Sequence, residues 1–275
     1  MSQTIAIIGF PWDEHSSFQR GAAEAPPLIR RGLFSDASNM WTETGIDLGE
    51  KGRITDAGDL DLYSSDDARE KIENAISRLL EQNLAPLSLG GDHAVSYPIV
   101  RAMRTAHPKL TVVQFDAHPD LYDEFEGDRY SHACPFARIM EEGLADRLIQ
   151  IGIRTMNAHQ RAQAERFGVE VIDMRAWDGA LSLTLDSPVY ISVDMDVFDP
   201  AFAPGVSHRE PGGLSVRDVI RAIHGLRATV VGADVVELNP RNDPLGVTAV
   251  VCAKLVKELA GKMSGARVRE ESEGP

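Results

Sequence analysis

The sequence predicts an α/β fold in which a parallel β-sheet is covered by helices on both faces. Continuous apolar runs, such as residues 85–89, 110–115 and 188–193, alternate along the chain with amphipathic helical segments. A sheet with one solvated face would show strict alternation of apolar and polar residues within each strand. The chain has 275 residues, 43% of them hydrophobic, so it can bury a large core. No linker divides it. We therefore expect a single domain over residues 1–275, with a charged, frayed tail from about residue 265.

The first elements are a strand, a polar loop and a helix. The strand is predicted over residues 4–9, and a loop containing His15, Ser16 and Ser17 follows it. Pro26 and Pro27 suit the first turn of a helix over residues 21–33, since the φ angle of proline is preset for that position. Residues 34–63 show no clear pattern, apart from a short strand predicted near Ile46.

From residue 66 onward, helices and strands alternate. The helix over residues 66–82 has apolar side chains at helical spacing, with Ser64 or Ser65 as its N-cap. The helix over residues 216–226 has Ser215 as N-cap and Asp218 in the capping-box position. The other strands are expected at residues 85–89, 110–115, 148–153, 169–173, 188–193 and 229–236. The other helices are expected at residues 95–105, 134–142, 158–167 and 247–259.

Composition excludes several classes of partner. The net charge is −14, and no run of Lys or Arg is dense enough to follow a phosphate backbone, so no nucleic-acid partner is expected. The first residues lack a basic region, and the apolar run at residues 5–8 is too short for a signal peptide or a membrane span. We therefore expect a cytoplasmic protein without membrane contact. Cys134 and Cys252 have no CxxC partner, which favours buried free thiols over a disulfide.

Potential metal ligands follow three of the predicted strands. Asp116, His118 and Asp120 come directly after one apolar run, and Asp194 and Asp196 end another. Side chains of an extended segment repeat every second residue, so each set projects from one face. Carboxyl ends of parallel strands are where ligands bind in open α/β sheets.

The third segment contains His93, which follows Gly90 and Gly91 at the end of its strand. Glycine lets the backbone turn sharply at this point. The three segments together offer four carboxylates and two imidazoles. Without metal the carboxylates would repel one another, whereas two divalent cations balance their charge. Donors rich in oxygen, with some imidazole, suit Mn²⁺ better than a metal that prefers thiolate.

These three segments together resemble the signatures of the ureohydrolase family, which includes arginases and agmatinases. They are residues 89–93 (LGGDH), 116–120 (DAHPD) and 192–200 (SVDMDVFDP). Further segments look most like plant-type arginases, namely residues 122–127 (YDEFEG), 130–133 (YSHA), 136–140 (FARIM) and 203–208 (APGVSH). The resemblance implies a three-layer αβα sandwich around an eight-stranded parallel sheet, assembled as a homo-oligomer, either trimer or hexamer. It also implies hydrolysis of a small guanidino substrate to urea and a primary amine.

The resemblance implies two Mn²⁺ per subunit. One ion would be held by His93, Asp116, Asp120 and Asp194, and the other by Asp116, His118, Asp194 and Asp196. It further implies that Glu237 grips the guanidinium and that His132 shuttles protons at the site mouth. We expect His132 to titrate near neutrality, and Asp120 to pass a proton to the leaving nitrogen.

The choice of guanidino compound depends on one substitution. Asp128 stands where plant-type arginases carry an asparagine, in a loop where the family recognises the substrate's α-carboxylate. A carboxylate there would repel arginine unless Arg129 or another cation compensates, which favours agmatine or another guanidino compound. The long resemblance to plant arginases favours arginine, which we rank slightly ahead. A zinc deacetylase, which needs a single metal, and a non-catalytic metal-bound scaffold are the alternatives from other classes.

Overall fold

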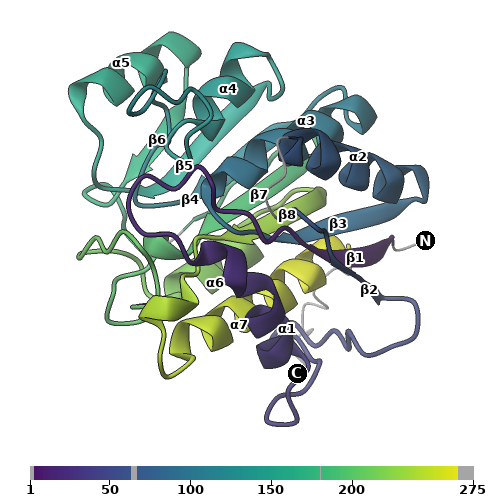
Figure 1. Ribbon diagram of the computed structural model, residues 1–275. Helices are drawn as coiled ribbons and strands as arrows, with labels where there is room; N and C mark the ends of the chain where they lie inside the picture. Colours follow the sequence, from purple (N-terminus) through teal and green to yellow (C-terminus); the bar gives the residue numbers. More distant parts are fainter. Residues whose placement is uncertain (1–2, 63–66, 180, 266–275) are drawn as a thin grey trace, which may run out of the picture.

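The computed structural model describes residues 3–62, 67–179 and 181–265, which form one parallel sheet between two layers of helices (Figure 1). The strands are β1 (Thr4–Gly9), β2 (Ile54–Asp59), β3 (Leu84–Leu89), β4 (Thr111–Phe115), β5 (Arg147–Ile153), β6 (Glu170–Asp173), β7 (Val189–Asp194) and β8 (Val230–Val236). Their order across the sheet is β2-β1-β3-β8-β7-β4-β5-β6, and every neighbouring pair is parallel. The predicted eight-stranded α/β fold is confirmed.

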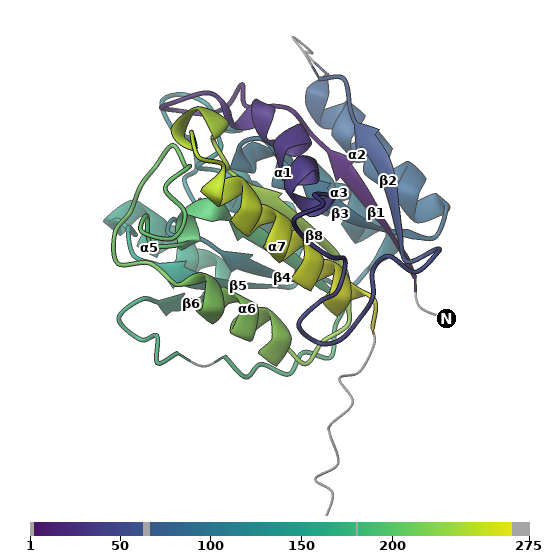
Figure 2. The ribbon, with the colours of Figure 1, turned by 90° about the horizontal axis from the view of Figure 1, so that it is seen from below.

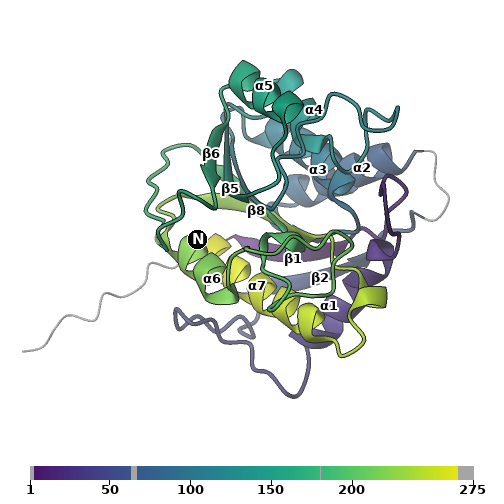
Figure 3. The same cartoon turned by 90° about the vertical axis from the view of Figure 1, so that its left-hand side faces the viewer.

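The helices divide between the two faces of the sheet. Figure 2 looks onto the face covered by α1 (Ala25–Leu33), α6 (Val216–Gly225) and α7 (Val247–Met263). Figure 3 shows α2 (Ala68–Glu81), α3 (Ser96–Ala106), α4 (Pro135–Glu141) and α5 (Ala158–Phe167) on the opposite side. Alternate strand residues feed two separate cores: Ile5 and Ile7 pack in the first, and Ala6 and Ile8 in the second. Burial on both faces explains why the strands read as continuous apolar runs.

Local sequence fixes several helix starts as predicted. Ser215 and Asp218 form the expected capping box at α6, in which each side chain bonds the other's backbone. Proline occupies the first turn of α1. The caps proposed for α2, Ser64 and Ser65, lie outside the described residues, as does the tail from residue 266. Cys134 and Cys252 are buried free thiols, as expected. Among the described helices, none has the length and apolarity needed to cross a bilayer.

The second strand differs from the prediction. Near Ile46 the chain forms no strand, and Asp47 makes only an isolated antiparallel bridge with Trp41. The missing strand is β2, which lies at the sheet edge and pairs only with β1. Its residues are mostly half-buried or exposed, since nothing covers an edge strand completely. A sequence search for apolar runs therefore passes over it.

The strand order places four strands side by side at the centre of the sheet. These are β3, β8, β7 and β4. Because all of them run in the same direction, their carboxyl ends meet along one short stretch of the sheet edge. This is the position at which open α/β sheets bind ligands.

Candidate metal centre

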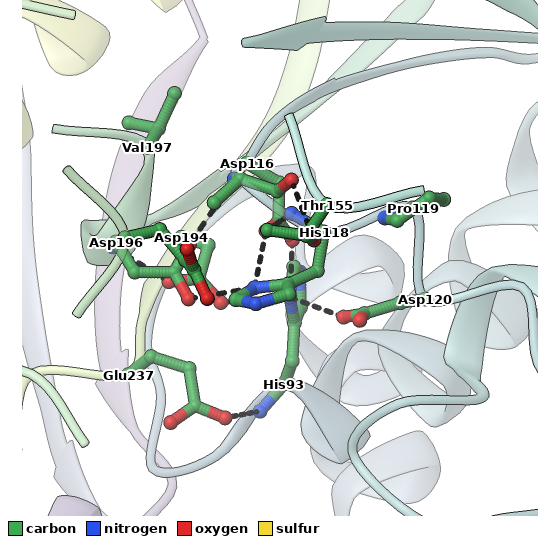
Figure 4. Close-up of polar contacts among 12 residues, drawn as sticks. His93, Asp116, His118, Pro119, Asp120, Thr155, Asp194, Asp196, Val197 and Glu237 are labelled. Carbon is green, nitrogen blue, oxygen red and sulfur yellow. Dashed lines mark hydrogen bonds and ion pairs between the residues drawn. The ribbon is translucent and has the colours of Figure 1, made fainter. Parts of the chain in front are cut away.

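The central strands bring all six predicted metal ligands to one place (Figure 4). Asp116, His118 and Asp120 follow β4, Asp194 ends β7, and Asp196 lies in the next turn. His93 follows β3 after the two glycines. A Cβ atom at Gly91 would collide with the backbone of Trp12, so the approach of His93 to the site requires glycine at that position.

His93 stands at the centre of one group of donors. Its Nδ1 atom lies 3.0 Å from the nearer carboxylate oxygen of Asp120, and 3.1 Å from an oxygen of each of Asp116 and Asp194. The imidazole and Asp116 are fully buried, and Asp120 and Asp194 are almost so. Buried carboxylates this close together repel one another strongly unless a positive charge balances them.

The hydrogen bonds of His93 show that Nδ1 is available to a metal ion. Nε2 lies 2.9 Å from the Ser192 hydroxyl, which itself donates to Asp234 over 2.7 Å. Since the Ser192 proton is committed to Asp234, Ser192 accepts a hydrogen from Nε2. Nδ1 is buried without any hydrogen-bond partner. Burial opposes the imidazolium form of His93, but the three carboxylates outweigh it and raise the pKa of His93, so a metal ion would take the place of the proton on Nδ1.

A second group of donors adjoins the first. His118 Nδ1 lies 2.9 Å from Asp196 and 3.5 Å from Asp116. The donor atoms of Asp116, His118 and Asp196 lie close enough to hold one ion, and those of His93, Asp116 and Asp194 to hold another. Asp116 belongs to both groups, whereas Asp194 falls in the first alone. The donors therefore fit a pair of metal ions with Asp116 between them.

Backbone amides fix the orientation of the carboxylates. Asp116 accepts a hydrogen bond from His118 N over 2.6 Å, Asp194 accepts one from Asp196 N over 2.8 Å, and Asp196 accepts one from Ala117 N over 3.1 Å. Each of these bonds occupies Oδ1. In Asp194 and Asp196 the other oxygen, Oδ2, then faces the nearest imidazole. The ligands are thus held in position before any ion binds.

Without metal, the ionised forms of two of the carboxylates, Asp120 and Asp194, are disfavoured in this site. Burial and the neighbouring Asp116 raise the pKa of Asp120 to about 6. Burial and the neighbouring carboxylates also raise the pKa of Asp194 well above its usual value. Asp120 and Glu237 further adopt the left-handed backbone region, with φ of 50° and 66°. Residues other than glycine rarely occupy that region, and those that do concentrate at functional sites.

Glu237 and His132 form a buried ion pair beside the metal-ligand groups. Glu237 follows β8, and its Oε1 accepts a hydrogen bond from His93 N over 3.0 Å. The same oxygen lies 2.8 Å from His132 Nδ1. Burial opposes the charged imidazolium, but Glu237 outweighs it and raises the pKa of His132 to about 9. In the absence of metal, His132 therefore does not titrate near neutrality as expected.

A cavity of about 170 Å³ opens over these groups. His118, Asp120, His132 and Glu237 line it, as the sequence predicts. His208, which the sequence placed at the mouth of the site, also lines the cavity, whereas sequence reasoning did not assign the further lining residues Ser17, Tyr122, Phe125, Thr155 and Gln160. Gln160 lies in α5 and the others lie in loops, so only the fold brings these residues together. Tyr122, Phe125 and His208 fall within segments that resemble plant arginases.

Asp128 is not among the lining residues of this cavity. Its carboxylate pairs with His15 Nδ1 over 2.5 Å, and Arg69 lies 3.2 Å from the other nitrogen of that imidazole. Arg129, which was expected to compensate Asp128, instead pairs with Asp123 and Glu141. Asp128 is therefore stabilised by a hydrogen bond from His15 and by the nearby positive charge of Arg69, which come from other positions in the chain.

Comparison with known proteins decides the family. The sequence model of the Arginase family matches residues 3–261. The chain belongs to the arginase family. It is a hydrolase of carbon–nitrogen bonds in linear amidines, the enzyme class predicted from the sequence.

Individual members of the arginase family match the chain along most of its length. Arginase 1, mitochondrial, of Arabidopsis thaliana is 48% identical, over 95% of this chain and 81% of that protein. Arginase, mitochondrial, of Medicago truncatula is 44% identical, over 96% of this chain and 83% of that protein. The solved arginase structure from Medicago truncatula superposes with a TM-score of 0.89 at 42% identity, covering 95% of this chain and 88% of that one. The predicted similarity to plant-type arginases is confirmed.

The expected cytoplasmic location is wrong. Both of these plant relatives are named mitochondrial, which contradicts the expectation. The expectation rested on the first residues of the chain, but Thr4–Gly9 form β1 within the sheet. These residues therefore form part of the sheet and carry no information about the cellular location of the protein.

Proposed function

We propose that this arginase-family hydrolase cleaves the guanidino group of L-arginine to urea and L-ornithine at a pair of Mn²⁺ ions. The observation that carries the proposal is the orientation of His93, whose buried Nδ1 faces three carboxylates with no hydrogen-bond partner. A packed core would not leave such an atom unpaired, since buried polar atoms almost always find partners. The adjoining group around His118 supplies the second position.

The donor set supports manganese in both positions. We assign His93, Asp116, Asp120 and Asp194 to one ion, and Asp116, His118 and Asp196 to the other, with Asp194 added to the second set because of the resemblance to the ureohydrolase family. Four carboxylates balance the charge of two divalent ions, and oxygen with imidazole suits Mn²⁺. When bound, such ions supply a nucleophile at neutral pH by lowering the pKa of water toward about 7.

The protein's own residues orient the substrate and move protons. Glu237 lines the cavity and carries a charge that suits paired hydrogen bonds to a guanidinium. Its Oε1 is fixed by His93 N and His132, so the carboxylate is held in one orientation. Asp120 lines the same cavity, where it can accept a proton from the nucleophile and pass it to the leaving nitrogen.

Arginine is favoured over agmatine by the surroundings of Asp128. An isolated carboxylate at the mouth would repel the α-carboxylate of arginine, but Asp128 is paired with His15. The pKa of Asp128 is lowered despite its partial burial, because the hydrogen bond from His15 stabilises the charged form. Agmatine remains the second candidate because Asp128 puts a carboxylate where plant-type arginases carry an asparagine.

Urea release measured side by side with arginine, agmatine and guanidinobutyrate tests the proposal. We expect the highest kcat/KM with arginine in the manganese-loaded protein. Asp128→Asn is expected to change kcat/KM for arginine by less than about tenfold, since His15 already offsets the carboxylate. A higher kcat/KM with agmatine than with arginine would identify agmatine as the substrate instead. No urea from any of the three compounds would contradict the proposed function.

We also propose that the chain acts as a single domain and assembles as a homo-oligomer, either trimer or hexamer. One sheet draws its strands from residues 4–236, which supports a single folding unit. Light scattering would give the mass of the assembly, and a monomer at micromolar concentration would contradict it.

A further inference from the structure

The two ring nitrogens of His132 are both committed within the protein. Nδ1 lies 2.8 Å from Glu237 Oε1, and Nε2 lies 2.8 Å from the hydroxyl of Ser17. The imidazole is buried, with 10% of its side chain exposed. His132 cannot contact a substrate through either nitrogen without first breaking one of these hydrogen bonds. Although His132 lines the cavity, a proton can leave its ring without breaking these hydrogen bonds only through one of the two partners.

The chemistry of Glu237 fixes the direction of both hydrogen bonds. Ionised Glu237 can only accept, so as long as Glu237 is ionised Nδ1 carries a hydrogen in both the neutral and the charged form of His132. In neutral His132, Nε2 therefore has a lone pair and accepts from the Ser17 hydroxyl. In the imidazolium form Nε2 donates to Ser17, whose own hydrogen must then turn to another acceptor. Ser17 lines the cavity, so a group bound within the cavity can be that acceptor.

The loop that carries Ser17 is anchored to the site. His132 N donates to the carbonyl oxygen of His15 over 3.1 Å, which ties this loop to the segment of His132 itself. His15 N and the Ser16 hydroxyl both donate to one oxygen of the buried Asp92, over 3.1 Å and 3.2 Å. Ser17 is thus held in place by its neighbours, as a group that transfers protons must be.

We propose that Ser17 carries the proton from His132 to the amine that leaves the substrate. The inference rests on the proposed function. In the transfer the Nε2–H bond breaks as a new Oγ–H bond forms, and the original Oγ–H bond breaks as the amine nitrogen uses its lone pair to form N–H. His132 ends neutral, the amine ends as an ammonium, and Ser17 is unchanged.

The role assigned to Ser17 differs from that expected for His132 alone. His132 is the proton store, and Ser17 is the catalytic residue that touches the leaving group. A hydroxyl at this position, and not merely a small side chain, is therefore required. Threonine keeps the hydroxyl and alanine does not, which provides a matched pair of substitutions.

The kinetic test compares Ser17→Ala, Ser17→Thr and Ser16→Ala in the manganese-loaded protein. Ser16→Ala controls for loosening of the loop, since the Ser16 hydroxyl anchors the loop to Asp92 and does not bond His132, and it should lower kcat less than Ser17→Ala. We expect Ser17→Ala to lower kcat by about 100-fold with little change in KM, as loss of a proton-transfer group does. Ser17→Thr should restore kcat to within about tenfold of wild type. A Ser17→Ala variant with wild-type kcat, or one impaired in KM alone, would overturn the relay.

A spectroscopic readout separates this proposal from the proposed function. Nitrogen NMR of the zinc-loaded protein, in which signals stay sharp, should show the His132 Nε2 resonance shifting in Ser17→Ala and not in Ser16→Ala. An unshifted resonance would show that the hydrogen bond is absent and would overturn the relay without touching the hydrolase. Absence of urea from the wild-type protein, together with a shifted resonance, would instead contradict the proposed function and the relay that rests on it.

Discussion

His93 and Asp234 are joined through a single hydroxyl group. The Nε2 atom of His93 lies 2.9 Å from Ser192 Oγ, which donates to Asp234 Oδ1 over 2.7 Å. The second oxygen of Asp234 accepts from the hydroxyls of Ser96 and Tyr190, each over 2.7 Å. All of these side chains are fully buried. The chain of bonds fixes which nitrogen of His93 carries the hydrogen, and so leaves Nδ1 for the metal.

Replacing Asp234 should therefore weaken metal binding from a distance. Asp234→Asn keeps the size of the side chain but lets an amide face the Ser192 hydroxyl, which then can turn its hydrogen toward His93. We expect the Mn²⁺ affinity to fall by about 10- to 100-fold. Calorimetric titration with Mn²⁺ measures it. Ser96→Ala, which removes one donor to the far oxygen of Asp234, is the control and should lower affinity less. Equal Mn²⁺ affinity in Asp234→Asn and wild type would show that the hydrogen bonds from His93 through Ser192 to Asp234 do not support metal binding.

The shared position of Asp116 distinguishes it from His118. Asp116 belongs to both groups of donors, and His118 to one. We expect Asp116→Ala to lose both metal ions and His118→Ala to lose one, with turnover abolished in each. Elemental analysis of the folded variants gives the metal content, and circular dichroism shows whether they fold. Full activity in either variant is incompatible with the dinuclear site.

The His132–Glu237 pair predicts a pH dependence of stability in the metal-free protein. Because the folded-state pKa of about 9 lies above the unfolded value of about 6.5, the pair stabilises the fold fully below about pH 6.5 and loses this effect as pH rises through about 9. The effect should be on the order of 3 kcal/mol. Denaturant unfolding of wild type and Glu237→Gln, compared across this range, measures it. Parallel pH profiles for the two proteins would show that the pair contributes nothing.

Metal removal should destabilise the protein more at alkaline than at acid pH. Burial and Asp116 raise the pKa of Asp120 to about 6, above its unfolded value of about 3.9. The metal-free fold therefore loses stability as pH rises through about 6, because charged Asp120 is disfavoured there. We expect the drop in Tm on chelation to be larger at about pH 8 than at about pH 5. A drop that is equal at both, or larger at the acid pH, would count against this account of the carboxylates.

The sequence predicted the buried central strands and the half-buried edge strand β6, but it missed the other edge strand, β2. Residues 111–115 of β4 are all buried, and their apolar run is plain in the sequence. In β2, Ile54 and Gly58 are half-buried and the other four residues are exposed, so no periodicity marks it. Backbone hydrogen bonds to β1 hold this strand in the sheet. Such bonds leave no signal in the pattern of side chains along the sequence.

The residues of the site also differ in how far the sequence alone predicts them. The spacing of Asp116, His118 and Asp120 is local, so strand geometry alone predicts their shared face. His132 and Glu237 required the family resemblance, because 105 positions separate them in the chain. Ser17 lies 115 positions from its partner His132, in a loop with no distinctive pattern. Contacts of this kind depend on the crossovers between strands, which the side-chain pattern does not specify.

The most direct test of the central claim is the number of Mn²⁺ ions that the folded chain retains after dialysis. We expect two per chain in the wild-type protein, with urea released from arginine only when both are present. A folded protein that saturates at one ion, or that releases urea after its metal is removed, would contradict the account.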